Sequence, residues 1–421
     1  MKYSPDIRKD YFWNTLGTSA VSFLSLLLSI AVTRINGIDT QGVFTLCFSF
    51  AILFFTIGLY GGRIYQVSDV IGEFENRTYI YLKFITSAAM IVTAFVFAIL
   101  SGYDGLRFTL LISLVVYKML DAIADPLYGV MQRNGCLYLA GISMTLKAVI
   151  GFVAFLAINL MTHNILYASL CLLGANLIFI AVFDIPNVRR LENITGLFSG
   201  NIKPSLILLK ASVYIFAFSL LSTLLLNIPR YYMDVFHSEA LLGFFNIVVM
   251  PASIMSLFVT FVIQPKLVPL SERFAAAEYA GFNKTVMKLI IISLIFGIFA
   301  IAAAWLIGIP VLSFIYGVDT SPYRVALTIS VTAGTINTIT MVLSNILSIM
   351  RRFKIQLFNY LAGTAGLFAA CLAFIRNGSV DGAIQAFLIA NAIQAVLFLI
   401  SYLVTYRRVS KSLPRTSQRL R

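Results

Sequence analysis

The stretch GLYGGRIYQVSD, residues 58–69, marks the point at which a long apolar segment ends in two glycines, an arginine and a polar cluster. An arginine in hydrocarbon costs roughly 3 kcal/mol or more unless it reaches water, a lipid headgroup or an anionic partner. Arg63 therefore marks either the edge of a membrane or the mouth of an anion-binding cavity. Both interpretations require that the neighbouring apolar segments cross a bilayer.

The composition places the whole chain in a membrane. Its 421 residues are 60% hydrophobic and 11% charged, whereas charged residues make up about 25% of a typical soluble domain. A chain of this length suits about a dozen spans of ~20 residues joined by short loops. The four cysteines stand singly, without metal-ligand or disulfide spacing, so we expect no metal and no cofactor.

Apolar segments follow one another along the chain and predict an all-α integral membrane protein with 12 transmembrane helices. A cytoplasmic linker at 186–205 separates six spans in 12–185 from six in 206–406, flanked by an interfacial segment, 1–11, and a basic tail, 407–421. The pattern therefore predicts two six-helix bundles. The spans are expected at about 12–33, 42–60, 80–100, 106–123, 141–160, 165–183, 206–228, 241–263, 286–307, 325–349, 355–375 and 382–406.

The distribution of lysine and arginine supports this layout, because cytoplasmic loops carry the excess of positive charge. With both termini in the cytoplasm, 26 of the 31 lysines and arginines fall inside and five fall outside. The net charge of +14 then reflects topology and needs no nucleic-acid partner. The five outside residues are Arg34, Arg107, Arg230, Arg324 and Arg376.

The two sets of six spans have the same orientation, which allows a parallel repeat about a pseudo-two-fold axis along the membrane normal. Short, similar motifs at corresponding positions of the two halves support the repeat. Arg34 is followed by GVFTL at 42–46 in the first half, and Arg230 is followed by GFFNI at 243–247 in the second.

Five basic residues lie inside spans or at their ends, and each could bind an anion: Arg34, Arg63, Lys147, Lys210 and Arg230. Guanidinium and ammonium groups supply charge-assisted hydrogen bonds to phosphate oxygens. Each could instead extend its charge to the lipid headgroups. Lys147 suits this second interpretation least, because it lies ~10 Å of helix rise inside its span.

Two further groups of residues could serve transport. Asp121 and Asp125 lie one helical turn apart, with Lys118 on much the same face. They could bind a proton or sodium ion for coupling, or form an ion-paired cytoplasmic helix end. Pro229 and Pro251 lie in the seventh and eighth spans, where proline removes a backbone hydrogen bond, and they predict either hinges beside a ligand or simple packing kinks.

Several short motifs, in this order, resemble those of bacterial polysaccharide flippases, the Wzx-type O-antigen and capsule flippases of the multidrug, oligosaccharidyl-lipid and polysaccharide (MOP) exporter superfamily. The first half contains TRING at 33–37, YGGR at 60–63 and QVSD at 66–69. The second half contains NIPR at 227–230 and QPK at 264–266. The resemblance extends over nearly the whole chain.

The resemblance implies two bundles facing each other across a basic central cavity and working by alternating access. It implies export of an undecaprenyl-pyrophosphate-linked oligosaccharide unit to the outer face of the bacterial plasma membrane. By this likeness, Arg34, Arg63 and Arg230 contact the pyrophosphate or sugar, and Lys147 is added for its depth. The implied partners are this lipid-linked oligosaccharide, membrane lipid, and the polysaccharide polymerase and chain-length machinery.

Two other functions remain open. A drug or organic-cation exporter on the same architecture needs buried carboxylates, and the spans offer Asp121 and Asp125. A membrane polymerase or ligase of envelope polysaccharide needs a catalytic outside loop, but no outside joint exceeds about 20 residues or pairs catalytic side chains. The sequence also has no nucleotide-binding Gly-x-x-x-x-Gly-Lys loop, so we expect a transporter and not an enzyme.

Overall fold

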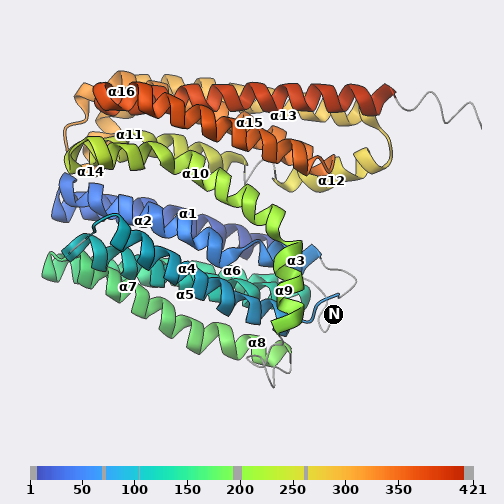
Figure 1. The fold of residues 1–421 in the computed structure, drawn as a ribbon, viewed down its shortest axis with the longest axis horizontal. Coiled ribbons are helices and arrows are strands. Elements are labelled where there is room, and N and C mark those ends of the chain that lie inside the picture. The colour runs from blue at the N-terminus through green and yellow to red at the C-terminus, as the bar shows by residue number, and fades with distance from the viewer. Residues whose placement is uncertain (1–6, 69–72, 104, 193–201, 260–263, 412–421) are drawn as a thin grey trace, which may run out of the picture. The chain divides into compact units, whose positions relative to one another are not determined.

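The computed structural model describes residues 7–68, 73–103, 105–192, 202–259 and 264–411. Within these ranges the chain forms helices joined by short connections and contains no strand (Figure 1). The sequence motif QVSD lies only partly in this set, because Asp69 falls outside the described residues.

The first compact unit, Met1–Leu224, holds six membrane-length helical segments, two shorter helices and the first half of a further long helix. Its elements are α1 (Ile7–Asn36), α2 (Ile38–Leu59), α3 (Gly62–Ser68), α4 (Asn76–Leu100), α5 (Gly105–Arg133), α6 (Leu137–Thr162), α7 (Ile165–Phe179), the π-helical turn η1 (Ile180–Asp184), α8 (Ile185–Leu191), α9 (Ile202–Ala211) and the first half of α10 (Val213–Phe236). One of the six segments, Ile165–Leu191, comprises three consecutive elements.

The second unit, Leu225–Arg421, begins within α10 and holds the remaining membrane-length helices. Its further elements are α11 (Glu239–Phe258), α12 (Gln264–Ala275), α13 (Tyr279–Ala303), η3 (Ala304–Gly308), α14 (Ile309–Tyr316), η4 (Ser321–Tyr323), α15 (Arg324–Ile349) and α16 (Phe353–Lys411). The last of these is two helices, because Ser379 breaks the helical backbone with φ 51° and ψ −138°.

Among the described residues, eleven helical segments are long and apolar enough to cross a membrane. α5 is the twelfth long helix, with 29 residues, and it is less apolar because it carries Lys118, Asp121 and Asp125 in its middle. The predicted all-α fold of twelve long helices in two bundles is therefore confirmed. Large apolar side chains such as Val92, Ile99 and Phe299 are exposed on these helices, as expected of surfaces that face lipid.

The seventh predicted span, at about 206–228, is divided in the structure. α9 ends at Ala211, and α10 starts at Val213 and continues beyond Pro229 to Phe236. α9 runs across the direction of α4 (Figure 1) and packs Leu208 against Tyr79 and Leu82. Arg230, expected in an outside joint, is consequently part of a helix.

The expected domain boundary also differs from the division into compact units. The sequence predicts a linker at 186–205, of which 193–201 lies outside the described residues. The compact units divide later, at Leu224, because α9 packs on the first bundle.

The predicted topology can be tested by cysteine labelling in intact cells, after replacing the four native cysteines with alanine. Cysteines at His163 and Asp319, in predicted outside connections, are expected to react with an impermeant maleimide. Cysteines at Ala276 and Arg352 should react only after permeabilisation, because they lie in predicted inside connections. The opposite labelling pattern would reverse the orientation.

Candidate functional site

A row of polar residues runs along one side of α5, inside the first unit. The row consists of Lys118, Asp121, Asp125, Tyr128 and Gln132, spaced alternately by three and four residues. Residues at this spacing share one face of a helix. Four of the five members meet a polar or charged group from a neighbouring helix, and Lys118 pairs with Asp121 within the row. The row is therefore the centre of the candidate site.

Two side chains, those of Lys118 and Asn176, contact the Asp121 carboxylate. Lys118 Nζ lies 2.9 Å from Asp121 Oδ2, and Asn176 Nδ2 of α7 donates to Asp121 Oδ1 at 2.9 Å. The ammonium of Lys118 also lies 4.8 Å from the centre of the Tyr117 ring, which stabilises a cation by its π face. Asp121 and Lys118, which the sequence predicts to share a helix face, thus form an ion pair midway along α5.

Asp125 pairs with a residue from α4. Its Oδ2 lies 3.1 Å from Lys83 Nζ, and the Lys83 side chain is only 1% exposed. Lys83 Nζ also contacts the carbonyl oxygen of Leu59 at the end of α2. A buried ion pair of this kind is costly to place in hydrocarbon and is tolerated where its hydrogen bonds are satisfied.

Lys147, identified in the sequence by its depth, has an ion-pair partner in the structure. Its Nζ lies 2.6 Å from Oδ2 of Asp184, a carboxylate with no exposed surface. Sequence reasoning placed Asp184 at the start of a polar connection and missed this pair. The available signal was that apolar residues continue on both sides of the aspartate, as in IAVFDIP at 180–186.

A π-helical turn places Asp184 inside the bundle. The turn, Ile180–Asp184, lies between α7 and α8, so the helix continues past the expected end of the span to Leu191. π-helical turns insert an extra residue into a helix and occur often at functional sites. The inserted residue changes the direction in which the Asp184 side chain points, so that its carboxylate meets Lys147 of α6.

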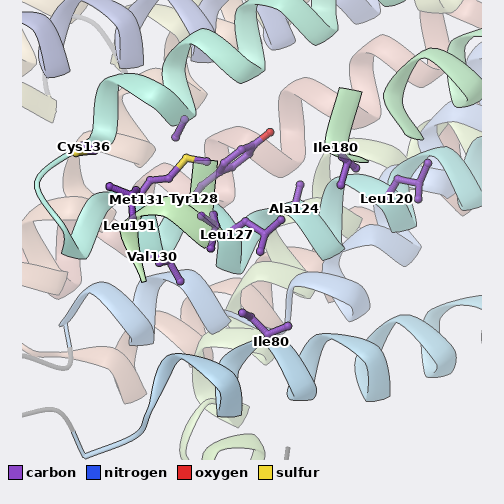
Figure 2. Close-up of a cluster of buried hydrophobic side chains, with 12 residues drawn as sticks. Ile80, Leu120, Ala124, Leu127, Tyr128, Val130, Met131, Cys136, Ile180 and Leu191 are labelled. Carbon is purple, nitrogen blue, oxygen red and sulfur yellow. The ribbon is translucent and has the colours of Figure 1, made fainter. Parts of the chain in front are cut away.

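Tyr128 connects the Lys147–Asp184 pair with Arg63. The Tyr128 ring centre lies 5.3 Å from Lys147 Nζ and 5.7 Å from the guanidinium carbon of Arg63. Its hydroxyl lies 3.1 Å from Ser143 Oγ. Figure 2 shows Tyr128 beside the apolar side chains of the same helix, which exclude water from this part of the row.

Arg63 differs from the lysines because neutral groups hold it. Its Nη2 donates to Gln132 Oε1 at 3.2 Å, and its guanidinium faces the Tyr128 ring. Among the described residues, no carboxylate lies within ion-pair distance of Arg63. Its positive charge is therefore not balanced in this part of the chain.

Arg34 does not belong to this cluster. It lies in the last turn of α1 and is exposed, next to the start of α2, whereas Arg63 follows the end of α2. The 22 residues of α2 rise by roughly 33 Å. Arg34 and Arg63 thus lie next to opposite ends of α2 and cannot bind the same phosphate together.

Arg230 forms a separate cluster in the second unit. Its Nε donates to Asn246 Oδ1 at 2.8 Å, and its Nη1 donates to Asn227 Oδ1 at 2.6 Å. The Asn246 side chain is 4% exposed and its Nδ2 has no hydrogen-bond partner among the described residues. Like Arg63, Arg230 is held by neutral amides and leaves donors available.

Both prolines lie inside helices that continue past them. Pro229 is in α10, directly before Arg230, and Pro251 is in α11, five residues after Asn246. Next to Pro251, the backbone of Ala252 approaches Gly334 of α15, where an added Cβ would lie 2.8 Å from Ala252 Cα. Hinge motion at either proline stays a prediction.

A comparison with known protein families finds no match. A search of characterised proteins finds a Staphylococcus aureus protein described as capsular polysaccharide biosynthesis protein CapF, 26% identical over 239 residues. The matched region covers 56% of this chain and 60% of the relative, so it spans less than two thirds of that protein.

Two solved structures of transporters resemble the chain. An inward-facing multidrug resistance MATE family transporter of the MOP superfamily aligns with a TM-score of 0.74 and 15% identity, over 94% of this chain and 99% of that one. The lipid II flippase MurJ in an inward closed conformation aligns with a TM-score of 0.71 and 12% identity, over 94% and 89%. The chain is therefore a multi-pass membrane protein with the fold of MOP-superfamily transporters.

Proposed function

We propose that this chain is a flippase that moves an undecaprenyl-pyrophosphate-linked oligosaccharide unit across the bacterial plasma membrane for surface polysaccharide assembly. One observation carries the proposal: Arg63 and Arg230 are held among apolar helices by neutral groups, with donors left for an anion. Guanidinium groups bind phosphate oxygens with charge-assisted hydrogen bonds. Two similarities support a lipid-linked oligosaccharide as the substrate class. One is to a protein described as a capsular polysaccharide biosynthesis protein, and the other is the fold shared with a lipid II flippase.

A drug or organic-cation exporter is the second candidate, supported by the fold shared with a multidrug transporter. Such a substrate needs a carboxylate that is free to accept a cation. Three carboxylates in and beside the polar row of α5 each lie within 3.1 Å of a lysine ammonium: Asp121, Asp125 and Asp184. This pairing favours the anionic substrate. A coupling role for Asp121 and Asp125 stays a prediction.

The proposal is tested by the sidedness of the strain's own labelled lipid-linked oligosaccharide in membrane vesicles. Arg63→Ala and Arg230→Ala are each expected to slow its movement about tenfold or more, since a hydrogen bond to a charged group contributes about 1.5–3 kcal/mol. Arg352→Ala, at an exposed arginine between α15 and α16, is the matched control and should move substrate at the wild-type rate.

Wild-type rates in both arginine variants, with normal insertion, would remove the arginine mechanism. Movement of an organic cation in place of the lipid, together with drug sensitivity and intact surface glycans in a deletion strain, would establish the drug exporter instead.

A further inference from the structure

The turn that joins α2 to α3 presents Arg63 and has a backbone that needs support. Tyr60 has φ 41° and Gly61 has φ 66°, so both lie in the left-handed region. A bulky residue such as tyrosine enters this region rarely and stays there only where surrounding contacts fix it. The position of Arg63 therefore depends on whatever holds this turn.

Lys83 of α4 holds the turn from one side. Its Nζ contacts the carbonyl oxygen of Leu59 and lies 3.5 Å from that of Gly58, and Thr86 Oγ1 donates to the same Gly58 oxygen at 2.8 Å. The last carbonyls of a helix lack partners within the helix, and a cation there interacts favourably with the helix dipole. Lys83 thus caps the end of α2.

The first half of α10, which belongs to the same unit, holds the turn from the other side. Tyr60 stacks on Phe216, with ring centres 4.4 Å apart and planes at 13°. Gly61 lies so close to Ile215 that an added Cβ would be 2.6 Å from its Cγ2. Support from two sides leaves the turn little freedom to move.

Lys83 has no donor left for a substrate. An ammonium group has three donors, and the surroundings supply three acceptors: the oxygens of Gly58 and Leu59 and the carboxylate of Asp125. The side chain is also closely covered, since a Cβ on Gly62 would lie 3.0 Å from Lys83 Cε. Arg63, by contrast, has five donors, of which one meets Gln132.

We propose that Lys83 is a positioning residue for Arg63, an inference that rests on the proposed function. Lys83 caps α2 and fixes the turn, and Asp125 neutralises the charge of Lys83. Of the two cations at this turn, Arg63 and not Lys83 contacts the anionic headgroup. Asp125 then helps to hold the turn in place by pairing with Lys83. This role is separate from the predicted role of Asp125 in ion coupling.

The test is binding of undecaprenyl pyrophosphate to the purified full-length protein, measured by native mass spectrometry. Lys83→Met is expected to weaken binding about tenfold in the wild-type background and to have no further effect in Arg63→Ala, because it acts through Arg63. Losses that add in the double variant would show that Lys83 itself contacts the ligand. Unchanged binding in Lys83→Met would also overturn the inference.

Two variants keep the test interpretable. Lys83→Met combined with Asp125→Leu removes the unpaired carboxylate that the single variant leaves, so it is used if the single variant does not fold. It should bind as weakly as Lys83→Met. Lys288→Met, at an exposed lysine of α13, is the matched control and should bind like the wild type.

A second readout separates failure of this inference from failure of the proposed function. If Arg63→Ala binds undecaprenyl pyrophosphate normally, Arg63 is not the proposed anion contact. The effect of Lys83 on the turn can still be measured in that case. Arg63→Cys, in a protein whose four native cysteines are replaced, reports the turn by its rate of maleimide labelling. Lys83→Met should change that rate several-fold, and an unchanged rate would overturn the positioning role.

Discussion

Replacing Lys147 with methionine is expected to lower the stability of the first unit by about 3–5 kcal/mol, the usual cost of removing one partner of a buried ion pair. The Asp184 carboxylate has no exposed surface and lies 2.6 Å from Lys147 Nζ, so the variant leaves a charge in the bundle interior. Tyr128 would also lose the cation near its ring. The apparent midpoint of heat-induced aggregation in detergent should fall by about 10 °C or more.

The double variant Lys147→Met and Asp184→Leu separates the cost of an unpaired charge from the loss of packing. Replacing a whole buried pair with apolar residues of similar volume is often neutral or stabilising, so most of the lost stability should return. Lys288→Met, which removes an exposed lysine, should melt like the wild type. A double variant as unstable as Lys147→Met would show that shape, and not charge, makes the site sensitive.

The fold could be read from the sequence because hydropathy and loop charge are local properties. Each predicted span falls on a membrane-length helix in the described residues, except that the seventh begins in α9 and the eighth extends to 260–263, outside them. The division of the seventh span at Ser212 was missed, because apolar residues continue across it. The packing of Leu208 on α4, a contact between distant segments, sets α9 apart from the helix that follows.

The candidate site was only partly predictable. Spacing alone placed Lys118, Asp121 and Asp125 on one face of a helix, and the structure confirms that face. The partners of the other lysines come from distant parts of the chain, and single-sequence reasoning has no rule for contacts between distant segments. The π-helical turn that directs Asp184 inward has no recognised sequence signal.

The structure also divides the basic residues into two kinds that composition cannot separate. Lys83, Lys118 and Lys147 each have a carboxylate within 3.1 Å, so their charges cancel inside the bundle. Arg63 and Arg230 are held by neutral groups among the described residues. We expect the paired lysines to stabilise and position the helices, and under the proposed function the arginines supply the charge that binds the anionic substrate.

Gly141→Ala is expected to destabilise the first unit by about 2–3 kcal/mol or more, because α1 and α6 touch through their backbones at this point. A Cβ on Gly141 would lie 2.3 Å from the carbonyl carbon and oxygen of Trp13, and a Cβ on Gly17 would lie 2.6 Å from the Gly141 oxygen. These neighbours are backbone atoms, so no side chain can rotate away. The two helices would have to separate.

Contacts at both ends of the pair oppose that separation. Tyr138 N donates to Asp10 Oδ1 at 2.7 Å at one end, and Asn159 Nδ2 donates to Asn36 Oδ1 at 2.7 Å at the other. Gly174→Ala on α7 is the control, since nothing lies within 4 Å of its added Cβ.

The two alanine variants should therefore differ in sign. Gly174→Ala should raise the free energy of unfolding by up to about 1 kcal/mol through helix propensity, and the melting midpoint with it. Gly141→Ala should lower the midpoint and reduce the yield of monodisperse protein. Equal midpoints for the two variants would mean that α1 and α6 are not in backbone contact in the folded protein.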